Sequence, residues 1–384
     1  MKVTSTADVL MTLLSIGGSM TDPKVDAAWS HVVFISADLG KLNMSSARAD
    51  AQVKWSTDQV AIHEQGYCAV YPKPLMSMLK SFGREVVTLE LSPNKTELSV
   101  HSGGSTLTMQ TIMSVGRPMQ MPSTDLLLTL DGDEALDAFE MAKVCAHNTA
   151  GDIFNVILIQ RYTDAKGISM VGVYGTDRSV MHAVKLTNVT EYAATIDATW
   201  AIPMDMLQGI SNAIIGDAVV QLFESKICVV SKDGALMANL VQAVFPVFMT
   251  TPFMKASMDN QGARSIVVER KVLVDTLNRA EFVEADLLRT KLAVDHTNKT
   301  LTLTSTSEHG KSLTATLELE ESDGSWHYHV AAGLLRNILK TLRTPQARIT
   351  WRGPLAPLAI ADVVQRDPDD WQITLQMGLK APAV

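Results

Sequence analysis

One short pattern of apolar residues occurs three times in this chain, at intervals of about 130 residues. Each copy has apolar pairs at helical spacing, and the copies begin at Pro72, Pro203 and Ala331. Each copy is followed by a run of strand-forming residues, at 86–91, 218–223 and 347–351. Because a repeat of this length is a whole domain and not a solenoid unit, the chain is predicted to contain one domain three times.

The predicted fold class is α+β, with two helices packed on antiparallel sheets in each repeat. The earlier helix of each repeat is expected at 7–19, 133–147 and 270–284, with an acidic residue near each start, where the helix dipole favours it. Alternating apolar runs predict strands at 86–91, 97–101, 106–112, 168–174, 226–230, 299–305 and 312–318. Two linker-like stretches, 118–124 and 250–262, divide the chain into predicted domains 1–124, 125–255 and 256–384.

Composition limits the possible functions. The chain has 384 residues, 46% hydrophobic content and a formal net charge of −8, so any nucleic-acid binding has to depend on local basic patches. Cys68, Cys145 and Cys228 lack metal-ligand spacing and are interpreted as buried thiols in a reducing, cytoplasmic setting. No apolar run reaches the roughly 18 residues of a membrane span, and the apolar start is interpreted as the first helix.

Two acidic or nucleophilic groupings could suggest an enzyme. Asp131, Asp133 and Glu134 could bind a metal, but they lie where a helix is expected to begin, and capping explains them better. A triad of Asp177, Ser179 and His182 is disfavoured because strand alternation points neighbouring side chains to opposite faces. The prediction is therefore a protein that is not an enzyme, with no cofactor and no metal.

The order of these features resembles the bacterial DNA polymerase III β subunit, the processivity sliding clamp, over roughly residues 1–379. The triple helix pattern carries part of the resemblance. Gly175-Thr176-Asp177-Arg178 stands where the family has a Thr-Asp-Gly-His-Arg turn, and the segment 244–248, Val-Phe-Pro-Val-Phe, stands where it has Phe-Pro-x-Tyr. The resemblance implies a DNA clamp fold with three repeated domains per chain. It also implies a ring-shaped homodimer that encircles double-stranded DNA and tethers the replicative polymerase and other replication and repair proteins.

A sliding ring needs phosphate contacts that read no bases, which favours Lys and Arg on the helices that line it. The candidate DNA-binding residues are Lys80, Arg84, Lys143, Lys271, Arg279, Arg336, Lys340 and Arg343. The second helix of the middle repeat, expected at 204–216, has neither Lys nor Arg, so the charge around the DNA is predicted to be uneven. An ordinary solvated helix face is the alternative interpretation.

The resemblance also implies an apolar pocket for a short linear motif of the Gln-Leu-x-Leu-Phe type, carried by DNA polymerase and the clamp loader. The matching positions are Phe154, Thr176, Met181, Pro246, Thr251, Pro357, Ile373 and Leu375. The chain departs from the family at Arg178-Ser179-Val180, which replace Gly-His-Arg, and at 375–378, which replace a Met-Pro-Met-Arg-like ending. These changes predict a divergent clamp with a pocket suited to a different motif.

Ring closure in the family pairs an edge strand of the first domain with one of the third. The aligned positions here are Leu107 and Met109 on one side and Phe282 and Val283 on the other. A head-to-tail contact of this kind satisfies both strand edges. The alternative function is a clamp-like interaction scaffold or decoy that binds clamp partners without encircling DNA.

Overall fold

The structure of the chain is a computed structural model, and it describes residues 1–21, 28–112, 125–146, 149, 151–163, 167–192, 198–245, 248, 254, 262–283, 289–307, 310–354, 356–363 and 372–377. The two predicted linkers, 118–124 and 250–262, lie outside these segments except for residues 254 and 262.

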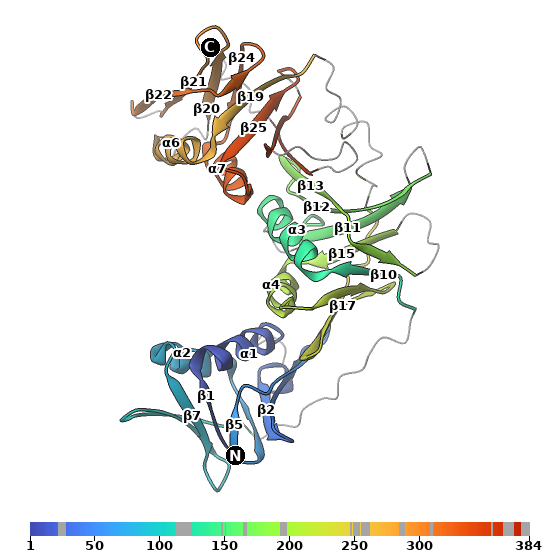
Figure 1. The fold of residues 1–384 in the computed structure, drawn as a ribbon, viewed down its shortest axis with the longest axis vertical. Helices are drawn as coiled ribbons and strands as arrows, with labels where there is room; N and C mark the ends of the chain where they lie inside the picture. Colours follow the sequence, from blue (N-terminus) through green and yellow to red (C-terminus); the bar gives the residue numbers. More distant parts are fainter. Residues whose placement is uncertain are drawn as a thin grey trace. The chain divides into compact units, whose positions relative to one another are not determined.

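The same order of elements occurs three times along the chain (Figure 1). Each copy runs strand, helix, three-stranded meander, two strands, helix, three-stranded meander. The α+β prediction is thereby confirmed. The sequence showed the repeat most clearly in the second helix of each copy, and the structure shows it in every helix and strand. The exact domain limits stay a prediction.

Six α-helices lie in the described residues, together with the 3₁₀ helix η1 (Ala28–Ser30). They are α1 (Ala7–Ser19), α2 (Pro72–Phe82), α3 (Gly132–Cys145), α4 (Met204–Ala213), α6 (Arg270–Val283) and α7 (Ala332–Thr341). Pro72 opens α2, as its fixed φ and missing N–H allow, and Gly83 ends that helix with a positive φ. Within the described part of the chain, no helix is long and apolar enough to cross a membrane.

Two antiparallel sheets contain the strands of the first repeat. Sheet A has five strands in the order β5 (Ala61–Glu64), β1 (Lys2–Thr6), β7 (Val86–Leu91), β8 (Glu97–Ser102) and β9 (Ser105–Gln110). Sheet B has nine, in the order β14 (Val189–Glu191), β10 (Leu128–Asp131), β16 (Val219–Leu222), β17 (Lys226–Ser231), β18 (Gly234–Asn239), β4 (Ala51–Thr57), β3 (Lys41–Ala47), β2 (Val33–Asp38) and β6 (Gly66–Val70).

Two further sheets contain the strands of the third repeat. Sheet C has nine strands in the order β15 (Ala198–Pro203), β11 (Val156–Thr163), β12 (Ser169–Thr176), β13 (Val180–Leu186), β27 (Gln372–Gln376), β26 (Leu358–Asp362), β25 (Gln346–Trp351), β19 (Arg264–Glu269) and β23 (Glu321–Ser322). Sheet D has four, in the order β22 (Ser312–Glu318), β21 (Thr300–Thr306), β20 (Thr290–Asp295) and β24 (Trp326–Val330).

Sheets B and C both continue across a boundary between repeats. In sheet B, β4 of the first repeat pairs with β18 of the middle repeat, and Val53 lies opposite Leu236. In sheet C, β13 of the middle repeat pairs with β27 of the third, and Met181 lies opposite Leu375. At both boundaries the last strand of one repeat's first meander therefore pairs with the last strand of the next repeat's second meander.

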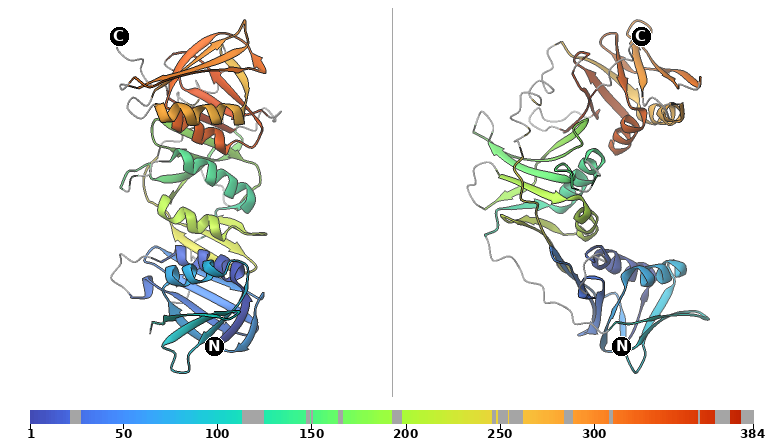
Figure 2. Two further views of the ribbon diagram at one scale, coloured as in Figure 1. Left: turned by 90° about the vertical axis from the view of Figure 1, so that its left-hand side faces the viewer. Right: turned by 180° about the vertical axis from the view of Figure 1, so that it is seen from behind.

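The helices of the first and third repeats lie side by side in pairs against the strands (Figure 2). In the third repeat, α6 and α7 bury Leu277 and Leu335 in a core shared with Leu303 of sheet D and Ile349 of sheet C. In the first repeat, α1 packs on α2 and also on α4 of the middle repeat. These apolar faces explain why the helical spacing was readable from the sequence.

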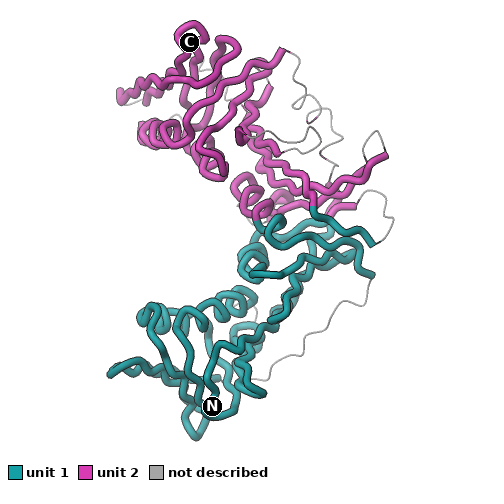
Figure 3. Tube along the Cα trace, viewed as in Figure 1, with its two compact units in different colours: residues 1–136, 188–195, 200–242 teal, residues 137–187, 196–199, 243–384 magenta. Residues whose placement is uncertain are grey.

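The contacts within the chain group it into two compact units (Figure 3). Unit 1 holds residues 1–136, 188–195 and 200–242, and unit 2 holds residues 137–187, 196–199 and 243–384. The division falls inside the middle repeat because its strands belong to two different sheets. Each continuous sheet therefore joins half of the middle repeat to a neighbouring repeat.

All three cysteines are buried and free. Burial raises the pKa of Cys68 and of Cys228 to about 12, and it raises the pKa of Cys145 still further. Because the thiolate is the reactive form, the native protein is expected not to react with Ellman's reagent at pH 8. The same assay in guanidinium should titrate all three thiols, and rapid labelling of the native chain would contradict this burial.

Candidate functional site

The predicted peptide pocket lies in unit 2, where sheet C passes from the middle repeat to the third. Met181 is paired with Thr176 on one side and with Leu375 on the other, so these three side chains share one row of the sheet. All three are buried, as is Pro357, whereas Ile373 and Phe154 are partly exposed. The structure therefore brings Thr176, Met181 and Leu375 together.

The turn between β12 and β13 is held by a dense set of hydrogen bonds. The Asp177 Oδ1 atom accepts from the backbone N–H groups of Ser179 and Val180, each at 2.8 Å, and from the Ser179 hydroxyl at 2.7 Å. Thr176 donates its hydroxyl to the Val180 carbonyl at 2.7 Å. The backbone N–H of Met377 donates to the Ser179 carbonyl at 2.8 Å, which ties the end of β27 to this turn.

Arg178 lies within this turn and reaches across to a neighbouring loop. Its Nη2 atom donates to the two carboxylate oxygens of Asp152, at 3.1 and 2.9 Å. Its guanidinium carbon lies 4.9 Å from the centre of the Phe154 ring, within the range of a cation–π interaction. Phe154 in turn lies 6.4 Å from the ring of Phe245. A charged group thus covers one wall of the predicted pocket.

Two of the predicted pocket residues, Pro246 and Thr251, lie outside the described residues. Sequence reasoning missed Asp152 and Phe245 as neighbours of the pocket, although Phe245 belongs to the segment that carried the resemblance. Asp152 gave no signal, because its role depends on a contact with Arg178 across 26 residues of sequence.

The candidate DNA-binding cations fall into two groups. Lys80, Arg84, Lys271, Arg279 and Lys340 are exposed. Arg84 lies just beyond the end of α2. Among the described residues, no carboxylate forms an ion pair with any of these five side chains. These five charges are therefore available to a polyanion.

The other three candidates are engaged in ion pairs. Arg336 bonds to Glu281 of α6, and its Nη1 atom also donates to Asn278 at 3.2 Å. Arg343, which lies beyond the end of α7, bonds to Asp137, and Lys143 lies 3.5 Å from Glu140 on its own helix. Their net contribution to a positive surface is smaller than their number implies.

The helices α1 and α4 contain no Lys or Arg. They pack together in unit 1, where the Asn212 side chain donates to the Ser15 carbonyl at 3.3 Å and accepts from Gln208 at 2.9 Å. Thr12 and Gln208 are exposed on these two helices. This part of the molecule offers hydroxyl and amide groups and the carboxylates of Asp8 and Asp205 in place of positive charge.

The predicted interface residues lie at or beside open sheet edges. Leu107 and Met109 are on β9, the edge strand of sheet A, and five of the six residues of that strand are exposed. Phe282 lies in the last turn of α6, with 74% of its surface exposed and Lys311 4.9 Å over its ring. Helix α6 packs against the edge strand β22 of sheet D. Val283 is buried.

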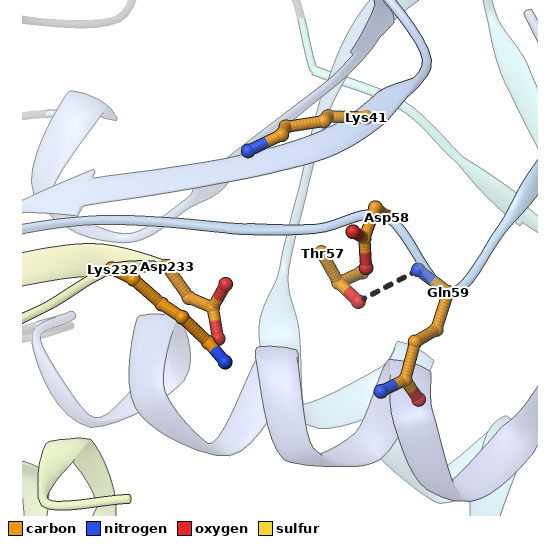
Figure 4. A pocket seen from close by; sticks show the side chains of 6 residues that line it. All are labelled: Lys41, Thr57, Asp58, Gln59, Lys232 and Asp233. Atoms are coloured by element: carbon orange, nitrogen blue, oxygen red, sulfur yellow. Dashed lines mark hydrogen bonds between the residues drawn. The ribbon is translucent and has the colours of Figure 1, made fainter. Parts of the chain in front are cut away.

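A polar cavity of about 300 Å³ lies in unit 1, near the boundary between β4 and β18. Figure 4 shows its lining, which comes from Lys41, the 57–59 segment at the end of β4 and the Lys232-Asp233 turn. Thr57 accepts a hydrogen bond from the Gln59 backbone at 3.2 Å. Two lysines and two aspartates balance each other here, so the cavity has no net charge to select a ligand.

The groupings that could suggest an enzyme have structural roles. Asp131 Oδ1 accepts from the Glu134 backbone N–H at 2.9 Å, which confirms the helix-capping interpretation. Ser179 donates to Asp177, whereas His182 is buried and bonded to Thr374 at 2.7 Å, so the three residues are not assembled as a triad. Within the described residues, no three His, Cys, Asp or Glu side chains gather as a metal-binding set.

The repeated order of elements and the sheets that continue between repeats define the fold of the DNA sliding clamps. A sliding clamp from Bartonella birtlesii bound to griselimycin matches with a TM-score of 0.78 and 16% identity. The β sliding clamp of Caulobacter crescentus gives 0.75 and 17%, and the Helicobacter pylori β clamp bound to a DNA ligase peptide gives 0.75 and 16%. Each match covers 99% of this chain and all of the other. No protein-family model and no curated protein matches the sequence.

Proposed function

We propose that this chain is a DNA sliding clamp, a ring-shaped homodimer that encircles double-stranded DNA and tethers a polymerase and other replication and repair proteins. The observation that supports this best is the pair of incomplete sheets. Sheets B and C each have nine strands, whereas sheet A has five strands and sheet D has four. Pairing β9 of one protomer with β22 of another would join sheets A and D into a third nine-stranded sheet. The pairing would follow the pattern of β4 with β18 and of β13 with β27, in which the last strand of one repeat's first meander pairs with the last strand of the next repeat's second meander.

The chemistry of the two open edges supports this pairing. Solvent-exposed edge strands usually carry charged residues that prevent pairing with other chains. Here β9 reads Ser-Thr-Leu-Thr-Met-Gln and has no charge, and β22 reads Ser-Leu-Thr-Ala-Thr-Leu-Glu with one charge at its end. Leu107 and the exposed Phe282 would supply apolar area beside the paired strands. A two-fold dimer would contain two such contacts and leave no edge of this kind open.

The DNA would be held by phosphate contacts alone. Lys80 on α2, Lys271 and Arg279 on α6 and Lys340 on α7 are exposed on helices in an otherwise acidic protein. Contacts of this kind are independent of sequence and can exchange with water, which sliding requires. The clamp acts without chemistry of its own in this proposal, and its partners dock through the pocket around Met181 and Leu375.

Electron microscopy of the negatively stained protein at micromolar concentration tests the proposal. Closed rings with a central hole wide enough for a DNA duplex are the expected result. Crescent-shaped single chains would instead favour the second candidate, a scaffold or decoy that binds clamp partners without encircling DNA. Helices α1 and α4 support that candidate, since they carry Asp8 and Asp205 but no Lys or Arg and so weaken the attraction for DNA on one part of the chain.

Replacing both Lys80 and Lys340 with glutamine is expected to weaken binding to any short duplex, whatever its sequence. Each lost phosphate contact should lower the slope of log affinity against log salt by about 0.9. Fluorescence anisotropy over a salt series measures both effects. The control is Lys54→Gln, since Lys54 is exposed on β4 of sheet B. An unchanged salt slope in the double variant would remove these two lysines from the DNA-binding surface.

A further inference from the structure

Arg178 has a backbone conformation that an arginine rarely adopts. Its φ angle is +77°, in the left-handed region that favours glycine. The surrounding turn fixes this conformation, because the Arg178 N–H donates to the Thr176 hydroxyl at 3.0 Å and Asp177 caps the next two residues. The turn therefore holds the side chain of Arg178 in one direction at some cost in conformational energy.

The guanidinium of Arg178 is held in place yet only partly used. Asp152 and the Phe154 ring fix it from two sides, and 55% of the side chain remains exposed. Both bonds to Asp152 come from Nη2, and in the described parts of the chain Nε and Nη1 donate to no acceptor. Each two-pronged fork of a guanidinium includes Nη2, which here is bonded to Asp152. Arg178 can therefore still offer another carboxylate one charge-assisted hydrogen bond, from Nη1 or from Nε.

Two apolar side chains are exposed near this cation, in addition to the polar turn residues Asp177 and Ser179. Ile153 is exposed next to Phe154, and Met377 is exposed where β27 is bonded to the turn. The row formed by Met181 and Leu375 lies directly beyond the turn. Exposed apolar side chains beside a fixed guanidinium suit a ligand that has apolar anchors and one negative charge.

The first repeat provides an internal comparison. Arg48 follows β3 in the first repeat, as Arg178 follows β12 in the second. There, however, Arg48 donates to Asp50 and also to Asp205 at 2.7 Å, and only 12% of it is exposed. The guanidinium of Arg48 is therefore bonded within the chain, in part to a residue of the middle repeat, whereas the guanidinium of Arg178 has N–H groups that a partner can bind.

We infer that Arg178 is a specificity-determining residue, which selects partner peptides that carry a carboxylate beside their apolar anchors. The inference rests on the partner pocket of the proposed function and names the class of peptide that this pocket accepts. The carboxylate would accept a hydrogen bond from Nη1 or from Nε while the apolar side chains of the peptide cover Phe154 and Met377. Because Asp152 already offsets part of the positive charge of Arg178, the expected preference for a second carboxylate is modest.

A positional scan with synthetic peptides tests the inference. The parent peptide is capped Gln-Leu-Ala-Leu-Phe, and Asp or Asn is placed in turn at the central position and at each flanking position. Fluorescence polarisation with the full chain should show one position where Asp binds about threefold to tenfold more tightly than Asn. This preference should decrease as salt increases.

Two variants separate recognition from support of the fold. Arg178→Gly suits the left-handed turn, so it should fold normally, bind the parent peptide and lose the preference for Asp. Arg178→Lys should keep part of the preference. Equal binding of Asp and Asn peptides by the unaltered protein, or a preference that persists in Arg178→Gly, would overturn this inference alone. Failure of every peptide to bind would overturn the pocket proposal as well.

Discussion

Replacing Phe282 with aspartate is expected to convert the protein from dimers to monomers at micromolar concentration. Burying a phenylalanine side chain contributes about 2 kcal/mol, and a two-fold dimer loses two such contacts. The loss of ~4 kcal/mol corresponds to roughly a thousandfold weaker association, before the cost of burying the new carboxylate. Because Phe282 is largely exposed in the single chain, the substitution should leave the fold intact.

Sedimentation velocity of both proteins over a concentration series measures this effect. The matched control is Leu39→Asp, which changes another exposed apolar residue, 92% accessible in the turn between β2 and β3. The control should stay dimeric. A Phe282→Asp protein that remains fully dimeric at micromolar concentration would mean that the protomers meet elsewhere.

Replacing Gly175 with alanine is expected to destabilise unit 2 by about 2–3 kcal/mol. A Cβ atom at this position would collide with the carbonyl oxygen and backbone of Ala142 on α3, where no flexible side chain can move away. The glycine allows α3 to approach β12 closely. Since Gly175 directly precedes Thr176, displacing the helix or the strand would also disturb the turn that carries Arg178.

Thermal or chemical unfolding followed by circular dichroism measures this loss. Gly104→Ala is the matched control, because the added Cβ atom would have no other atom within 4 Å and the backbone there is not in the left-handed region. An unchanged midpoint for Gly175→Ala would show that α3 can move away from the sheet without cost.

The helices could be predicted closely from the sequence because each has a local signal. The apolar spacing and Asp8 placed the first helix at 7–19, which is the extent of α1, and the strands at 86–91 and 312–318 were also correct. The partners of β4 and β13 could not be predicted. Strand pairing across repeats depends on residues more than 170 positions apart, and many alternating strands share the same pattern.

The candidate sites were predictable to a smaller degree. The sequence placed Met181 and Leu375 in one pocket through the resemblance, and the pairing of β13 with β27 brings them together. It could not reveal that Arg336 and Arg343 are bonded to acidic residues, since the positions of cations along a sequence carry no information on their neighbours in space. In the sequence, Arg178 was visible only as a departure from the family pattern. Its proposed role could be inferred only from the positions of Asp152 and Phe154 in the structure.

The sheets that continue between repeats determine where the chain can be cut into fragments that stay folded. A fragment ending at residue 124 would contain β4 without β18, and so would expose a full strand edge with the apolar faces of Val53 and Trp55 beside it. Such an edge promotes aggregation between fragments. Single repeats expressed alone are therefore poor reagents, and soluble pieces should instead be cut so that each paired ladder remains whole.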